Sequence, residues 1–111
     1  LSAVTAACMM NPKSVYEEVG YMEEKLAVAF NDVDFCLKLL EKGYRNVYNP
    51  YVELIHYESK SRGLEDTKEK IERFNSEIER FQKKWDRILV EGDPFYNPNL
   101  ALDRSDFALR K

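Results

Sequence analysis

The stretch Asn-Asp-Val-Asp-Phe-Cys-Leu-Lys-Leu-Leu-Glu-Lys, residues 31–42, predicts the central helix of this chain. Asn31 is a residue type that caps helix N-termini, and Gly43 stands where a helix-terminating glycine belongs. Between these ends the apolar side chains recur at helical spacing, so that one face of the helix is apolar. Its members are Val33, Cys36, Leu37 and Leu40. We expect the rest of the chain to be organised around this helix.

Two aspartates in the first turn of the predicted helix point in different directions. At about 100° per residue, Asp32 lies at the edge of the apolar face, whereas Asp34 points away from it towards Lys38. Asp34 has an ordinary explanation as an i,i+4 ion-pair partner of Lys38. Asp32 lies among the free N–H groups of the first turn, where the helix dipole favours a carboxylate. It is therefore either a base working at neutral pH or a charge that stabilises the helix.

Composition excludes several classes of protein. A chain of 111 residues can form one small domain with a modest core, and 44% hydrophobic with 33% charged residues is typical of a globular chain. A net charge of −3 provides no attraction to nucleic acid. No stretch approaches the roughly 18 apolar residues of a membrane-spanning helix. Cys8 and Cys36 each have apolar neighbours, which predicts buried thiols in a reducing compartment and no zinc site.

The remaining elements are expected to be short strands, one short helix and one long helix. The apolar run at 2–10 is typical of a strand buried on both faces. Such a strand needs neighbours that the chain does not supply, so we expect the chain to belong to a larger protein. The other expected elements are a short helix from Asn11-Pro12 to Gly20, a loop at 21–30, strands at 44–48 and 52–57, and a polar turn at 59–63. The expected fold class is therefore α/β.

A long helix is expected from Asp66 to about Val90, opened by a capping box formed by Asp66 and Glu69. Its apolar stripe fits either a coiled-coil seam or a helix packed on a globular body. The aromatic members of the stripe favour packing. The stripe comprises Leu64, Ile71, Phe74, Ile78, Phe81, Trp85 and Ile88. We therefore divide the chain into a body at 1–63, this helix at 64–90 and an extended tail at 91–111.

The order and spacing of several motifs resemble the acceptor-side half of family 2 glycosyltransferases of GT-A fold, among them rhamnosyltransferase-like bacterial and archaeal members. The resemblance spans residue 1 to about residue 99, nearly the whole chain. The motifs that carry it are the small-residue run Ala6–Met10, Glu18-Val19-Gly20, Asp32-Val33-Asp34-Phe35, Gly43–Pro50, and His56 followed by Ser59, Ser61 and Arg62.

The resemblance implies roles for individual residues. Asp32 matches the family's general base, which deprotonates the acceptor hydroxyl, and Asn31 replaces an acidic residue beside it. Asp34 follows as an acceptor-side neighbour. His56 matches a histidine that helps to bind a divalent metal, the alternative being a strand-end histidine bonded to backbone. Ser61 and Arg62 match a turn near the donor diphosphate. For Arg62 the alternative is a solvated charge or an ion pair with Glu58 or Glu65.

The resemblance also implies partners and a location. The substrates would be a nucleotide-sugar and a glycan acceptor, with Mn²⁺ or Mg²⁺ as cofactor, for cell-surface polysaccharide synthesis. The sequence contains no Gly-rich phosphate loop, so a separate N-terminal half is expected to bind the nucleotide, and this chain alone is expected to be inactive. We further expect a cytoplasmic protein, with a peripheral position at the inner membrane face as the alternative. Its uncovered apolar surfaces predict a homo-oligomer.

Two other functions fit parts of the sequence. In the first, the chain is a non-catalytic interaction or dimerisation module whose long helix pairs with a partner. In the second, Asp32, Asp34 and His56 form a metal-dependent hydrolase site, which the opposed directions of the two aspartates disfavour.

Overall fold

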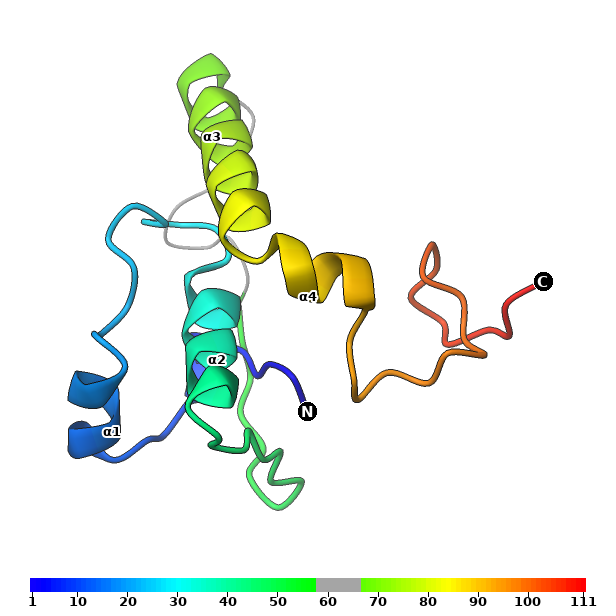
Figure 1. Ribbon diagram of the computed structural model, residues 1–111, viewed down its shortest axis with the longest axis horizontal. Coiled ribbons are helices and arrows are strands. Elements are labelled where there is room, and N and C mark those ends of the chain that lie inside the picture. The colour runs from blue at the N-terminus through cyan, green and yellow to red at the C-terminus, as the bar shows by residue number, and fades with distance from the viewer. Residues whose placement is uncertain (58–66) are drawn as a thin grey trace.

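The computed structural model describes residues 1–57 and 67–111, and this part of the chain is built from helices (Figure 1). A 3-10 turn, η1 at Ala6–Cys8, precedes the α-helices α1 at Lys13–Glu18, α2 at Asn31–Glu41, α3 at Lys68–Lys84 and α4 at Asp86–Glu91. Within the described ranges, β geometry is limited to one isolated antiparallel bridge between Leu100 and Leu109. The expectation of an α/β fold is therefore wrong for the described residues, which form a helical structure.

The segment at 2–10 contains η1, flanked by extended residues at Thr5 and Met9, and does not form the predicted buried strand. Side chains of α2 take hydrogen bonds that a neighbouring strand would otherwise take. The Ala6 N–H donates to Asp32 Oδ2 at 3.1 Å, and the Val4 N–H donates to Cys36 Sγ at 3.5 Å. A strand needs a partner for its ladder, and the described residues place a helix there instead.

The two other predicted strands, at 44–48 and 52–57, are also absent among the described residues, where 44–57 is an extended segment only in the sense that it has no helix and no ladder. Asn49 separates them as expected, because its side-chain oxygen accepts the N–H of Tyr51 at 3.0 Å and so closes a turn. Most apolar side chains of this segment are exposed, namely Val47, Tyr48, Tyr51, Val52, Leu54, Ile55 and Tyr57.

The predicted ends of the short helix α1 are close to the observed ones. Pro12 was expected as the first helical residue. It is instead the N-cap, and the helix begins one residue later at Lys13. At the other end Gly20 has φ +81°, and the N–H groups of Gly20 and Tyr21 donate to the carbonyls of Glu17 and Tyr16. This pair of bonds is a Schellman motif, which satisfies carbonyls that the helix leaves unpaired.

The C-terminus of α2 confirms the role expected for Gly43. Its φ is +85°, its N–H donates to the Leu40 carbonyl at 3.0 Å, and the Tyr44 N–H donates to the Leu39 carbonyl at 3.0 Å. These bonds form a second Schellman motif. A glycine meets this positive φ without the steric cost that a Cβ would bring.

The N-terminus of α2 differs from the expectation by one residue. Phe30, in the left-handed conformation with φ +62°, is the N-cap, and Asn31 is the first helical residue. A non-glycine residue in this conformation costs about 1–2 kcal/mol. The Phe30 ring stacks on Phe81 with centroids 5.1 Å apart, and this packing offsets the strain. Tertiary contact therefore decides where α2 begins.

The long C-terminal helix is divided at Trp85 into α3 and α4. Trp85 is the C-cap of α3 and the N-cap of α4, with φ −113° and ψ 22°. Thr67 caps α3 by accepting the Lys70 N–H at 3.2 Å. The expected capping residue Asp66 lies outside the described residues, as does the first residue of the stripe, Leu64.

The core forms where α2, the loop before it and the α3–α4 junction meet. Leu26, Leu37, Phe81 and Trp85 are buried together, and Phe30, Val33, Leu40 and Ile88 pack around them. The C-terminal part of the apolar stripe therefore packs on the body of the chain. Ile71, the first member of the stripe within the described residues, is 46% exposed.

The two cysteines lie in different surroundings, so the expectation of two buried thiols is wrong for Cys8, which is exposed. Cys36 is buried on α2. Burial raises the pKa of the Cys36 thiol, Asp32 raises it further, and a hydrogen bond with the Val4 backbone opposes the rise.

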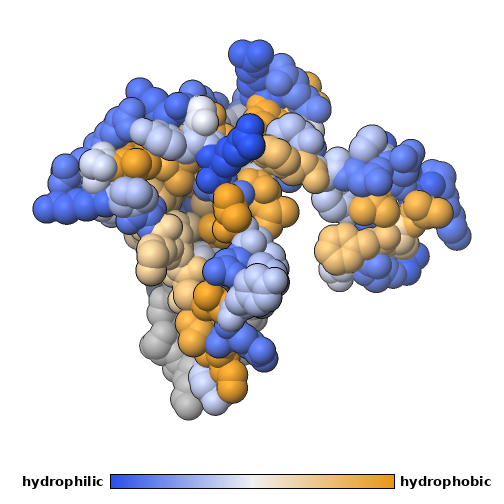
Figure 2. All heavy atoms as spheres, turned by 90° about the horizontal axis from the view of Figure 1, so that it is seen from below, coloured by the Kyte–Doolittle hydropathy of each residue, from blue (hydrophilic) through white to orange (hydrophobic). Residues whose placement is uncertain are grey.

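The C-terminal segment after α4 lies apart from the helices, and hydrophobic residues are visible at the surface of both parts (Figures 1 and 2). The Tyr96 hydroxyl donates to the Ala101 carbonyl at 2.9 Å, and the Ala101 N–H donates to the Ala108 carbonyl at 2.8 Å. The tail thus folds back on itself. Its separation agrees with a radius of gyration of 15.4 Å, above the roughly 13 Å of a compact domain of this size.

None of the helices in the described residues combines the length and the apolar character needed to cross a bilayer.

Gly43→Ala tests the helix end that the sequence specified. No atom lies within 4 Å of an added Cβ, so the only penalty is the backbone conformation. We expect the free energy of unfolding of the chain to fall by about 1 kcal/mol, measured by urea denaturation with circular dichroism. Gly43→Asn, which tolerates the left-handed region better, should lose about half as much. Equal stability of Gly43→Ala and the parent chain would contradict this account.

Candidate functional site

Asp32 lies in the first turn of α2, half-buried against the N-terminal segment. Its Oδ1 accepts the Val33 N–H at 2.9 Å, and its Oδ2 accepts the Ala6 N–H at 3.1 Å. Both carboxylate oxygens are thus oriented by backbone groups. Each oxygen can accept two hydrogen bonds, so the carboxylate keeps accepting capacity for a further donor.

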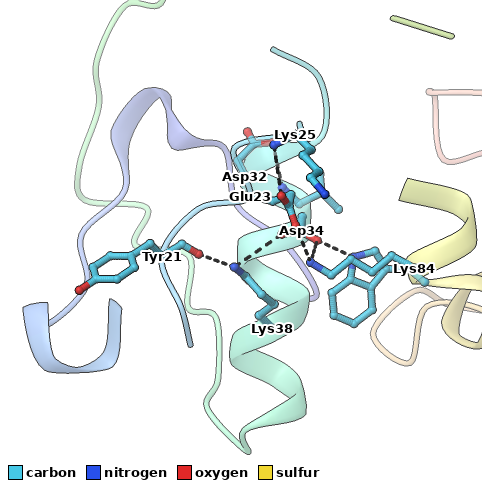
Figure 3. A network of polar contacts seen from close by, with 9 residues as sticks. Tyr21, Glu23, Lys25, Asp32, Asp34, Lys38 and Lys84 are labelled. Carbon is cyan, nitrogen blue, oxygen red and sulfur yellow. Dashed lines mark hydrogen bonds and ion pairs between the residues drawn. The ribbon is translucent and has the colours of Figure 1, made fainter. Parts of the chain in front are cut away.

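Asp34, two residues later, is completely buried and points to the other side of α2. Its Oδ1 lies 2.9 Å from Trp85 Nε1 and 2.6 Å from Lys84 Nζ, and its Oδ2 lies 3.8 Å from Lys38 Nζ (Figure 3). Lys38 is the partner that the helical spacing predicted. The pair is not on the surface, however, because the α3–α4 junction covers it.

The charges around Asp34 balance. Lys84 also lies 3.8 Å from Glu23 Oε2, and the Lys38 ammonium donates to the Tyr21 carbonyl. Burial lowers the pKa of Lys38, and Lys84 lowers it further, whereas Asp34 and Glu23 oppose this shift. Two carboxylates and two ammonium groups therefore share one partly desolvated network. A buried carboxylate is tolerated only with such pairing and hydrogen bonding.

Glu77 on α3 is a second buried carboxylate and was not singled out by the sequence analysis. It is 2% exposed, its Oε1 accepts the Val28 N–H at 3.1 Å, and its Oε2 accepts the Ala29 N–H at 2.9 Å. It thereby ties the loop before α2 to α3. Its position three residues after Phe74 and four before Phe81 places it on the apolar face of the helix. This spacing could have indicated from the sequence that Glu77 is buried.

The other predicted site residues are not gathered around Asp32 in the described structure. Asn31 is half-buried at the start of α2, and His56 is exposed near the end of the extended segment. Ser61 and Arg62 lie outside the described residues. Their predicted contact with a diphosphate therefore stays a prediction.

A metal site is not formed by residues 1–57 and 67–111 on their own. No group of three or more His, Cys, Asp and Glu side chains in these ranges is arranged to hold a metal ion. Mn²⁺ and Mg²⁺ need several ligands, and the exposed His56 would be one. The metal role of His56 stays a prediction that depends on ligands from elsewhere.

Two shallow hollows occur on the described surface, and neither is lined by Asp32 or His56. One, of about 320 Å³, is lined by Gly20, Tyr21, Met22, Glu23, Glu24, Lys25 and Lys38. The other, of about 530 Å³, is lined by Glu23, Lys25, Ser76, Glu79, Arg80, Lys83 and Lys84. Both are open and highly charged, so they provide no enclosed site for a substrate.

Two curated proteins are similar to nearly the whole chain. It is 50% identical over 109 residues, 97% of its length, to the uncharacterized protein y4gI of Sinorhizobium fredii. It is 34% identical over 109 residues, 98% of its length, to the O-antigen biosynthesis protein RfbC of Myxococcus xanthus. The chain spans only 12% of the first protein and 8% of the second. No family model and no solved structure matches the chain.

Asp34→Leu tests the buried network. The change removes the shared acceptor and leaves Trp85 Nε1 and two ammonium groups without their carboxylate. We expect the free energy of unfolding to fall by about 2–3 kcal/mol, below the usual cost of breaking a buried pair because the Lys84 side chain is 33% exposed. Urea denaturation measures it, with the exposed Glu41→Leu on the same helix as control. A loss no larger than that of the control would show that the network does not stabilise the fold.

Proposed function

We propose that the protein is a glycosyltransferase of polysaccharide biosynthesis, which transfers a sugar from a nucleotide-sugar to an acceptor hydroxyl with Asp32 as general base. Two observations on the sequence support this proposal. The motifs around Asp32 resemble family 2 glycosyltransferases, and one similar protein carries the name O-antigen biosynthesis protein. The observation that carries it is the orientation of Asp32 at the start of α2, where its two oxygens accept the backbone N–H groups of Val33 and of Ala6 in the N-terminal segment.

The chemistry of this step needs a carboxylate at the acceptor hydroxyl. The hydroxyl oxygen attacks the anomeric carbon, a new carbon–oxygen bond forms, and the bond from that carbon to the diphosphate breaks. The electron pair of the broken bond leaves on the nucleoside diphosphate, and the hydroxyl proton passes to Asp32. A base must lie within hydrogen-bond distance of the hydroxyl, about 3 Å, to do this. The orientation of Asp32 suits this requirement because it costs no reorganisation when the acceptor arrives.

Donor binding is assigned in this proposal to residues outside the described ranges. Ser61 and Arg62 would contact the diphosphate, and a separate nucleotide-binding half would hold the nucleotide. A divalent metal would neutralise the leaving diphosphate. His56 belongs to no group of three or more possible ligands in the described part of the chain, so the other ligands would have to come from elsewhere.

Asp32→Asn tests the proposed base in the full-length protein. The probes are UDP- and dTDP-sugars with Mn²⁺ and a membrane extract as the source of acceptors, and release of nucleoside diphosphate measures turnover. We expect turnover to fall by roughly 10²–10⁴-fold, the usual contribution of a general base, with donor binding nearly unchanged. Glu41→Gln, at an exposed position of the same helix, should keep full activity. Normal turnover of the Asn variant would remove Asp32 from the mechanism.

A second candidate function, an interaction module, is favoured by the apolar side chains exposed along the extended segment. Val47 is 79%, Tyr51 96% and Ile55 80% exposed. Neighbouring exposed apolar groups of this kind are typical of surfaces that bind other protein surfaces. The proposed partner is a second copy of the chain. The dimer interface would then be formed by the segment that contains Val47, Tyr51 and Ile55, and not by the long helix.

Light scattering of the 111-residue chain tests this association. We expect a homo-oligomer at micromolar concentration, because dimerisation removes the exposed apolar groups from water. Ile55→Lys should shift the equilibrium towards the monomer, whereas the control Lys83→Ala on α3 should not. A monomer at every concentration would contradict the second candidate and leave the first untouched.

A further inference from the structure

Trp85 connects the α3–α4 junction to the first turn of α2. It is the only tryptophan of the chain, and its ring is buried. Its backbone N–H donates to the Phe81 carbonyl at 3.0 Å, and its carbonyl accepts the Leu89 N–H at 3.0 Å. Trp85 therefore belongs to both helices, and it cannot shift without disturbing one of them.

The side chain of Trp85 donates its Nε1–H to Asp34 Oδ1 at 2.9 Å. The neighbouring Lys84 places its Nζ 2.6 Å from the same oxygen and 5.5 Å from the centre of the Trp85 ring. One carboxylate oxygen thus receives two donors from consecutive residues (Figure 3). This oxygen is held in position by two groups of the α3–α4 junction.

A second contact joins the start of α2 to the same stretch of α3. The Phe30 ring stacks on Phe81, four residues before Trp85, and the Phe30 carbonyl accepts the Asp34 N–H at 2.8 Å. The first turn of α2 is therefore held at two points, Phe30 and Asp34. Both points lie against one turn of α3.

This attachment sets the rotation of α2 about its own axis. Asp32 and Asp34 are two residues apart, about 200° around a helix of 3.6 residues per turn. A rotation that moved Asp34 away from Trp85 would turn Asp32 through the same angle and away from Ala6. Such a rotation would therefore change the direction of the Asp32 carboxylate.

We infer that Trp85 is a positioning residue for Asp32 and acts through the Trp85–Asp34 hydrogen bond. The inference rests on the proposed function, in which Asp32 is the base. Trp85 itself contacts neither substrate nor reacting atoms in this account. Its contribution is the orientation of the base, and a misplacement of about 1 Å can lower a catalytic rate by up to 10²-fold.

Trp85→Phe in the full-length protein isolates this contribution, because it keeps an aromatic ring and removes only the N–H donor and part of the ring. The assay uses whichever of the UDP- and dTDP-sugars supports turnover of the parent protein. We expect kcat to fall about tenfold and KM for that donor to change less than twofold. Ile88→Val, which trims the same apolar cluster without touching the hydrogen bond, is the matched control and should keep kcat.

The decisive comparison repeats Trp85→Phe in the Asp32→Asn background. If Trp85 acts through Asp32, the second substitution has no further effect once the base is absent. The same tenfold loss in both backgrounds would overturn the inference, and so would an unchanged kcat of Trp85→Phe alone. Normal turnover of Asp32→Asn by itself would instead remove the proposed function.

Asp34→Asn provides a second route should Trp85→Phe fail to fold. Asparagine keeps an oxygen for the Trp85 N–H and loses the charge that pairs with the lysines. The comparison is with Asp34→Leu, which removes this oxygen as well as the charge, and we expect its kcat to be about tenfold below that of Asp34→Asn. Equal kcat values of the two variants would overturn the inference.

Discussion

The structure depends on the buried carboxylate of Asp34. Removal of a carboxylate from water carries a large free-energy cost unless donors and opposite charges replace the solvent. The chain meets this requirement with groups from two directions. Lys38, from the next turn of α2, supplies an opposite charge 3.8 Å from Oδ2, and Lys84 and Trp85, from the α3–α4 junction, place their donors on Oδ1. Because these groups lie far apart in sequence, pairing one side chain brings the two main helical elements together.

In the same arrangement, the first turn of α2 contacts different parts of the chain on its two sides. On one side, Asp34 and the Phe30 ring hold it to α3 and to the junction. On the other, Asp32 receives the N–H of Ala6 from the N-terminal segment. The loop before α2 is held independently, since Glu77 on α3 accepts two of its backbone N–H groups. A carboxylate with a fixed direction is thus built from local helix geometry and from contacts on the opposite face.

The extended segments explain why the sequence pattern predicted an α/β fold. Runs such as 2–10 and 52–57 have the β-branched, aromatic and apolar residues of strands, but neither run is a strand, and the first contains the 3-10 turn η1. A strand, however, is defined by a partner as well as by its own conformation. In the described residues, side chains of Asp32, Cys36 and Asn46 bond to the N-terminal segment in place of a ladder. Propensity therefore predicted strands that the described residues do not form, because the pairing partners are absent from the described ranges.

The sequence by itself determined the features that depend on neighbours along the chain. Periodicity located α2, Gly20 and Gly43 specified the ends of two helices, and i,i+4 spacing predicted the Asp34–Lys38 pair, because these properties are set within one or two turns. Only the tertiary structure decided the others. Phe30 replaced Asn31 as the cap because its ring stacks on Phe81. The long helix ends at Trp85, whose indole N–H bonds to Asp34. Asp34 is buried because a helix more than forty residues away covers it, and burial of a charge is a property of the assembled chain rather than of any local pattern.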